Sequence, residues 1–172
     1  MLIDRTPDPR VGCVQVPRSQ RRQPSQKGGP MENDVQSSLS DLKTFAERCI
    51  GAEHYPNDYH VFSPFECHAC GVVPLRLRIE HHTGSRKGRF RGVIFARCAK
   101  CGEERRVFSF TGEHRRPLRE ERPVCRCGSK EFLAGNCERL EGDEGVPGFF
   151  DGGVIVGKCV DCGRNRAFVH TD

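Results

Sequence analysis

The sequence has 172 residues, a formal net charge of +5, 35% hydrophobic and 30% charged residues, and no tryptophan. So low a content of bulky apolar residues excludes a large core. The chain also has no apolar run of the roughly 20 residues that a membrane helix needs. We find no secretory signal before the eleven cysteines, which predicts a reducing, cytoplasmic setting and no membrane partner.

Residues 1–30 hold six Lys and Arg and five of the eleven prolines, without hydrophobic periodicity. This composition predicts a disordered basic segment. Two interpretations stay open: a basic tail that touches nucleic acid, or upstream sequence ahead of a true start at Met31. The second is favoured because Lys27-Gly28-Gly29 can be encoded by a purine-rich ribosome-binding sequence.

Residues 33–51 carry apolar side chains at helical spacing, namely Val35, Leu39, Leu42, Ala46 and Cys49. Asn33 is the candidate N-cap, and Gly51 stands where a helix often ends. We expect an amphipathic helix whose apolar face docks on the adjacent metal module. A role as a dimerisation or protein-partner helix is the alternative, and the sequence indicates no oligomeric state.

The following 120 residues contain an internal repeat, because residues 91–102 resemble residues 152–163. In each copy an apolar strand enters a Cys-x-x-Cys-Gly turn, and a second cysteine pair followed by glycine lies upstream. Two such turns brought together by a hairpin aim four thiolates at one point. The predicted ligands of two Zn²⁺ ions are Cys67, Cys70, Cys98 and Cys101 for the first, and Cys125, Cys127, Cys159 and Cys162 for the second.

The second site departs from this pattern at its first turn, where one residue instead of two separates Cys125 from Cys127. Cys125 is therefore the least certain ligand, and Cys137 could replace a member of the set. Apparent zinc-binding free energies of about 10–16 kcal/mol exceed what small cores supply, so we expect loss of the fold when the metal is removed.

The two paired-turn hairpins resemble the zinc-ribbon superfamily over residues 66–110 and 124–170. The resemblance implies two tandem three-stranded antiparallel zinc ribbons and does not cover the N-terminal helix. Together with the amphipathic helix expected from its spacing, it predicts a small metal-stabilised α+β fold. The expected boundaries are a basic ribbon at 60–112, a charged linker at 113–123 and an acidic ribbon at 124–172. Strands are expected at 75–80, 90–97, 105–110, 131–134, 137–140, 152–158 and 166–170.

Charge separates the two ribbons. Residues 60–122 hold 14 Lys and Arg against 7 Asp and Glu, whereas residues 123–172 hold 6 against 8. We therefore expect the first ribbon to bind DNA or RNA, or a nucleic-acid-associated complex. The candidate contact residues alternate along one strand and gather at the hairpin tip: Arg76, Arg78, Arg86, Lys87, Arg89, Phe90 and Arg91.

Other functions stay open at this stage. The chain could be a non-catalytic protein-interaction adaptor in which the helix and each ribbon meet different partners. Four thiolates also hold iron in rubredoxin-like redox proteins. Asp143-Glu144 resembles the acidic pair of transcript-cleavage factors that assist RNA polymerase. No Ser-His-Asp grouping or phosphate loop is present, so we do not expect an enzyme.

Overall fold

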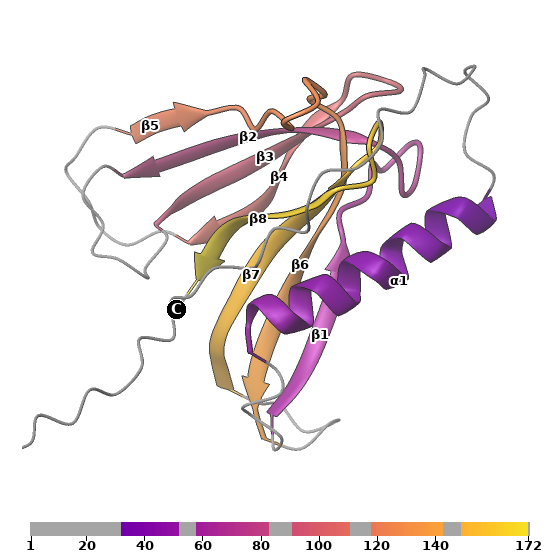
Figure 1. Ribbon diagram of the computed structural model, residues 1–172. Helices are drawn as coiled ribbons and strands as arrows, with labels where there is room; N and C mark the ends of the chain where they lie inside the picture. The colour runs from indigo at the N-terminus through magenta and orange to yellow at the C-terminus, as the bar shows by residue number, and fades with distance from the viewer. Residues whose placement is uncertain (1–31, 52–57, 83–90, 111–117, 143–148, 172) are drawn as a thin grey trace, which may run out of the picture.

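The computed structural model describes residues 32–51, 58–82, 91–110, 118–142 and 149–171 (Figure 1). Within them the chain forms one helix and eight strands. In chain order these are α1 (Glu32–Cys49), β1 (Asp58–Pro64), β2 (Leu75–His82), β3 (Gly92–Cys98), β4 (Glu104–Phe110), β5 (Leu118–Glu121), β6 (Phe132–Glu141), β7 (Phe149–Cys159) and β8 (Asn165–Thr171). No helix in these residues is long and apolar enough to cross a membrane.

Two antiparallel meanders make up most of the sheet, β2-β3-β4 (ribbon 1) and β6-β7-β8 (ribbon 2). They are joined edge to edge where Leu75 of β2 pairs with Phe132 of β6, in the order β4-β3-β2-β6-β7-β8. The expected tandem ribbons therefore share one sheet and a common core. The strands expected at 131–134 and 137–140 are continuous in β6.

The joining pair shows how the repeats are related. Leu75 follows Cys70 by the same interval as Phe132 follows Cys127, so the two residues that pair are equivalent members of the repeat. Both meanders also shift register at equivalent positions, after Ile94 in β3 and after Ile155 in β7. Such β-bulges bend a strand and change its direction. Their repetition indicates two copies of one unit in an approximately two-fold arrangement.

The strand that precedes each ribbon pairs with the other ribbon. β1 lies before ribbon 1 but pairs with β6, and β5 lies before ribbon 2 but pairs with β2. The registers are equivalent, since Ser63 opposes Asn136 as Glu121 opposes Ile79. This exchange corrects two predicted boundaries: residues 60–64 pair with ribbon 2, and the linker at 113–123 contains β5.

The exchange also decides where the helix lies. Because α1 directly precedes β1, it packs on ribbon 2 (Figure 1). The expectation from the sequence, that it docks on the adjacent ribbon 1, is wrong. Leu42 and Ala46 are fully buried against Val154 and Val156. The Asp41 carboxylate accepts a 2.7 Å hydrogen bond from Lys158 Nζ, which fixes the helix over β7.

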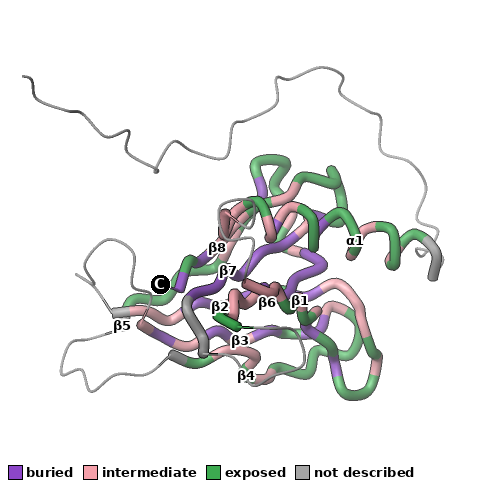
Figure 2. The backbone as a smooth tube through the Cα atoms, turned by 90° about the horizontal axis from the view of Figure 1, so that it is seen from below, coloured by how far each residue is buried: buried purple, intermediate pink, exposed green. Residues whose placement is uncertain are grey.

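The main core lies between the inner faces of the two ribbons, the faces turned toward one another. It is built from Leu77, Ile79, Ile94 and Ala96 of ribbon 1 with Ala134, Ile155 and Val169 of ribbon 2. Along β3 only alternate residues are buried, whereas β6 is buried continuously from Phe132 to Cys137 (Figure 2). A strand covered on both faces has this pattern. Ribbon 2 is thus covered on both faces, and ribbon 1 on its inner face.

Candidate metal centres

The first cysteine group lies where the β2-β3 hairpin brings its two turns together. Cys67 and Cys70 stand on the turn before β2, and Cys98 and Cys101 on the turn after β3. The four sulfur atoms all lie within 4.8 Å of one another, and the Sγ atoms of Cys67 and Cys101 are 3.5 Å apart. This grouping follows from the hairpin register, which places Cys98 opposite Leu75.

Backbone hydrogen bonds hold both turns in shape. Cys67 N donates to Gly71 O and Gly71 N donates to Cys67 O, each at 2.9 Å. In the second turn Gly102 N donates to Cys98 O at 3.0 Å. Gly71 and Gly102 have φ of 69° and 79°, a left-handed conformation that glycine adopts without steric cost. The glycine after each cysteine pair is therefore a requirement of the turn.

Backbone amide groups lower the pKa of the thiols in this site, whereas burial raises it. The backbone N–H groups of Cys101 and Lys100, both 3.4 Å from Cys98 Sγ, lower the pKa of Cys98 to about 6. Burial raises the pKa of Cys67 to about 12. One thiolate is thus favoured by the backbone, while the charge of the full set needs a cation to offset its burial.

The second cysteine group has the same arrangement in ribbon 2. Its sulfur atoms also lie within 4.8 Å of one another, with Cys125 Sγ 3.5 Å from Cys162 Sγ and Cys127 Sγ 3.5 Å from Cys159 Sγ. Cys137 is not in this group. Its side chain is fully buried beneath α1 in the cluster with Leu42.

The shortened first turn of this site closes by a tighter hydrogen bond. Gly128 N donates to Cys125 O at 2.8 Å, one residue closer in sequence than the bond from Gly71 to Cys67. The outer bond, from Cys125 N to Ser129 O at 2.7 Å, spans the same interval as its counterpart in ribbon 1. The turn therefore absorbs the missing residue. Although burial opposes it, the N–H of Cys127 lowers the pKa of Cys125 to about 7.

Both groups fit a tetrahedral thiolate site. Zn–S bonds of about 2.3 Å give sulfur-to-sulfur edges of about 3.8 Å in a tetrahedron. The sulfur pairs at 3.5 Å, within groups no wider than 4.8 Å, approach this size. Each group can hold one metal ion through four cysteines: Cys67, Cys70, Cys98 and Cys101 in ribbon 1, and Cys125, Cys127, Cys159 and Cys162 in ribbon 2.

The predicted nucleic-acid residues are only partly within the described chain. Arg76 and Arg78 lie on the outer face of β2, and Arg91 directly precedes β3. Arg86, Lys87, Arg89 and Phe90 lie outside the described residues, as do Asp143-Glu144 and residues 1–30.

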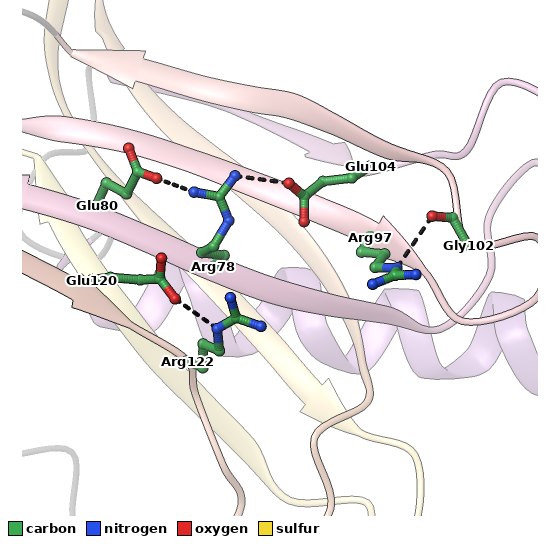
Figure 3. A network of polar contacts seen from close by, with 7 residues as sticks. All are labelled: Arg78, Glu80, Arg97, Gly102, Glu104, Glu120 and Arg122. Carbon is green, nitrogen blue, oxygen red and sulfur yellow. Dashed lines mark hydrogen bonds and ion pairs between the residues drawn. The ribbon is translucent and has the colours of Figure 1, made fainter.

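Further arginines, outside the predicted contact residues, share the outer face of ribbon 1. Arg97 alternates with the buried residues of β3, and Arg106 of β4 pairs with Phe95. Arg122 donates to Glu120 at 2.7 Å beside β2 (Figure 3). We call this set the arginine face: Arg76, Arg78, Arg97, Arg106 and Arg122. Strict alternation along β3 could have indicated Arg97, but the pairing of β5 with β2 that adds Arg122 has no sequence signal.

Carboxylates compensate the arginine face unevenly. Arg78 contacts both Glu80 and Glu104, and Arg76 Nη2 lies 2.7 Å from Glu131 Oε1. Arg97 Nε instead donates to the carbonyl of Gly102 at 3.2 Å, which satisfies its hydrogen bond without cancelling its charge (Figure 3). The exposed positive charge is therefore greatest toward β3 and β4.

Comparisons of the chain with protein-family models, curated proteins and solved structures gave no match.

Proposed function

We propose that the protein is a non-catalytic nucleic-acid-binding protein whose fold is stabilised by two zinc ions. Its contact surface is the arginine face of ribbon 1. The observation that carries this proposal is the contrast between equivalent faces of the two repeats. On ribbon 2 the outer face is mainly apolar and lies under α1, and Lys158, its counterpart of Arg97, is paired with Asp41 of the helix. On ribbon 1 the same face displays five arginines.

The charge of this face suits a phosphate backbone. Four carboxylates, Glu80, Glu104, Glu120 and Glu131, lie among the five arginines, so the face keeps a net charge of +1. The sequence that continues from β2 to β3 adds three more cations and no acid between His82 and Arg91. Phosphate contacts by Lys and Arg release counterions and supply most of the affinity for nucleic acid.

The metal sites support a structural role for zinc. Four cysteines complete a tetrahedral shell, so neither group leaves the open position that a catalytic zinc needs. The proposed setting is the reducing cytoplasm, which keeps the thiols available to metal. Iron fits the same four sulfurs, and metal analysis of the protein as purified, together with its colour, distinguishes the two.

The alternative function, a protein-interaction adaptor that binds a partner through the apolar face of α1, is less well supported. Its buried residues Leu42 and Ala46 already face ribbon 2, so a partner would have to displace the helix. On ribbon 1 the positions equivalent to Cys137 and Phe62 are Glu80 and Glu120, which do not suit a second apolar helix.

The test is binding of labelled DNA and RNA oligonucleotides to the zinc-loaded chain, measured by fluorescence anisotropy at two salt concentrations. Reversing two charges with Arg97→Glu and Arg106→Glu should weaken binding at least about tenfold and reduce the log–log salt slope by about 2. The matched control reverses two exposed charges on ribbon 2, Lys130→Glu and Arg164→Glu, and should retain most of the affinity. Absence of binding at low salt would overturn the proposal in favour of an adaptor.

A further inference from the structure

Arg78 occupies an unusual position at the centre of the arginine face. Its guanidinium carbon lies 4.0 Å from the centroid of the Phe95 ring, within the range of a cation–π contact. One terminal nitrogen contacts Glu80 and the other lies 2.7 Å from Glu104 Oε1 (Figure 3). The ring below and the carboxylates on either side fix the guanidinium in place.

The same contacts make Arg78 a poor phosphate ligand. One guanidinium between two carboxylates gives the group a net charge of −1, and the nitrogens that would bind phosphate already have partners. The side chain is nevertheless 18% exposed. What it offers to a ligand is therefore a planar surface held over an aromatic ring, and not an uncompensated charge.

Uncompensated charge lies beside this surface. Arg106 is exposed and pairs across the sheet with Phe95, and Arg97 lies two residues farther along β3. The hydrogen bond from Arg97 to the Gly102 carbonyl leaves its charge intact. A planar plate with cations on one side matches a nucleotide, since the base is flat and the phosphate next to it is anionic.

The repeat supports a specific role for this pair. The position equivalent to Arg78 in ribbon 2 is Gly135, where an added Cβ would lie 2.7 Å from Phe62 Cζ. There the aromatic ring of the exchanged strand covers the sheet, and α1 covers the strand next to it. On ribbon 1 the arginine takes the place of that cover and leaves a planar surface facing outward.

We propose that Arg78, held on Phe95, is a stacking plate for an unpaired base, and that the ligand of the arginine face is single-stranded nucleic acid. This inference rests on the proposed function. Bases in a duplex are stacked on one another and cannot reach a flat sheet face without being extruded. A single strand can lay a base on Arg78 while Arg97 and Arg106 contact its phosphates.

The test compares three ligands of equal length on the full zinc-loaded chain: an oligothymidylate, an abasic oligomer with the same phosphates, and a duplex. The wild-type protein should bind the oligothymidylate at least about fivefold more tightly than the abasic oligomer, the lower end of one stacking contact. Arg78→Lys keeps the charge but removes the plane, so it should abolish this preference. Arg164→Lys, at an exposed position outside the arginine face, should preserve it.

The outcomes separate this inference from the proposed function. Equal affinity of the wild-type protein for base-bearing and abasic oligomers would overturn the stacking plate and leave nucleic-acid binding intact. Tighter binding of the duplex would do the same. No binding to any of the three would remove both. The wild-type comparison needs no variant, and zinc content reports whether Arg78→Lys has kept the fold.

Discussion

The two ribbons share one backbone plan but differ on their outer faces. Ribbon 2 presents Gly135, Cys137, Val154 and Val156, which lie beneath Phe62 and α1. At the equivalent positions ribbon 1 has Arg78, Glu80, Val93 and Phe95, and no element in the described part of the chain lies over them. Because β1 pairs with β6, α1 lies over ribbon 2 and covers its outer face, while no described element covers the outer face of ribbon 1 in the same way.

The two ribbons differ in the role of their outer faces, but the stability of each depends on the other. The inner faces form a common core, so neither ribbon can lose its structure without exposing apolar surface of the other. Because the shared core involves only the inner faces, the outer face of ribbon 1 can be polar and that of ribbon 2 apolar within the same fold.

The largest expected effect comes from breaking the first metal site. Cys98→Ser removes one ligand of ribbon 1 and should unfold both ribbons, because a structural zinc site contributes about 10–16 kcal/mol, which is comparable with the whole 5–15 kcal/mol net stability of an ordinary domain. Zinc content should fall toward zero per chain, and not to one. Cys137→Ala, a buried cysteine outside both groups, should keep two zinc ions. Retention of one zinc and a folded ribbon 2 in Cys98→Ser would show that the ribbons are independent.

A smaller effect is expected where the exchanged strand packs most tightly. Gly135→Ala would place a methyl group 2.7 Å from Phe62 Cζ and 2.8 Å from the Ser63 carbonyl. Because backbone must move, we expect a loss of about 1–3 kcal/mol in the free energy of unfolding, measured by urea denaturation. Ala134→Gly, on the same strand but the inner face, is a control for chain flexibility. Unchanged stability of Gly135→Ala would mean that β1 does not lie against β6 in this register.

The effect that is smallest at neutral pH concerns the buried thiol beneath α1, which changes stability only at high pH. Burial raises the pKa of Cys137 from 9.0 to about 12, so the folded state retains its proton where the unfolded state loses it. The stabilising contribution is complete below pH 9 and is lost as pH rises from about 9 to 12. Thermal unfolding of the wild-type protein should therefore show a steeper loss of stability over this range than Cys137→Ala. Parallel curves would place Cys137 in contact with solvent.

The local features of the sites were predictable because they depend on residues close in sequence. Each turn is specified by its cysteine pair and the following glycine, and alternation between Leu75 and Glu80 indicates a half-buried strand. The helix at 33–51 was also evident from its spacing, and its apolar residues Leu42 and Ala46 are buried.

The arrangement of these pieces was not predictable in the same way. Neither β1 nor β5 was expected as a strand, and the side-chain pattern of a strand carries no information about which edge it joins. The exchange therefore escaped detection, and with it the position of α1 and the gathering of Arg97, Arg106 and Arg122 on one face. The internal repeat was visible, yet its two-fold pairing depends on Leu75 meeting Phe132, a contact between residues far apart in sequence.

The most direct test of the difference between the ribbons is to follow backbone amide resonances of the zinc-loaded protein by NMR while a short single-stranded oligonucleotide is added. We predict shift changes in β2, β3 and β4 of ribbon 1, centred on Arg78, Phe95 and Arg106, with β6, β7 and β8 unaffected. Changes confined to ribbon 2 or α1, or none at saturating oligonucleotide, would contradict the account.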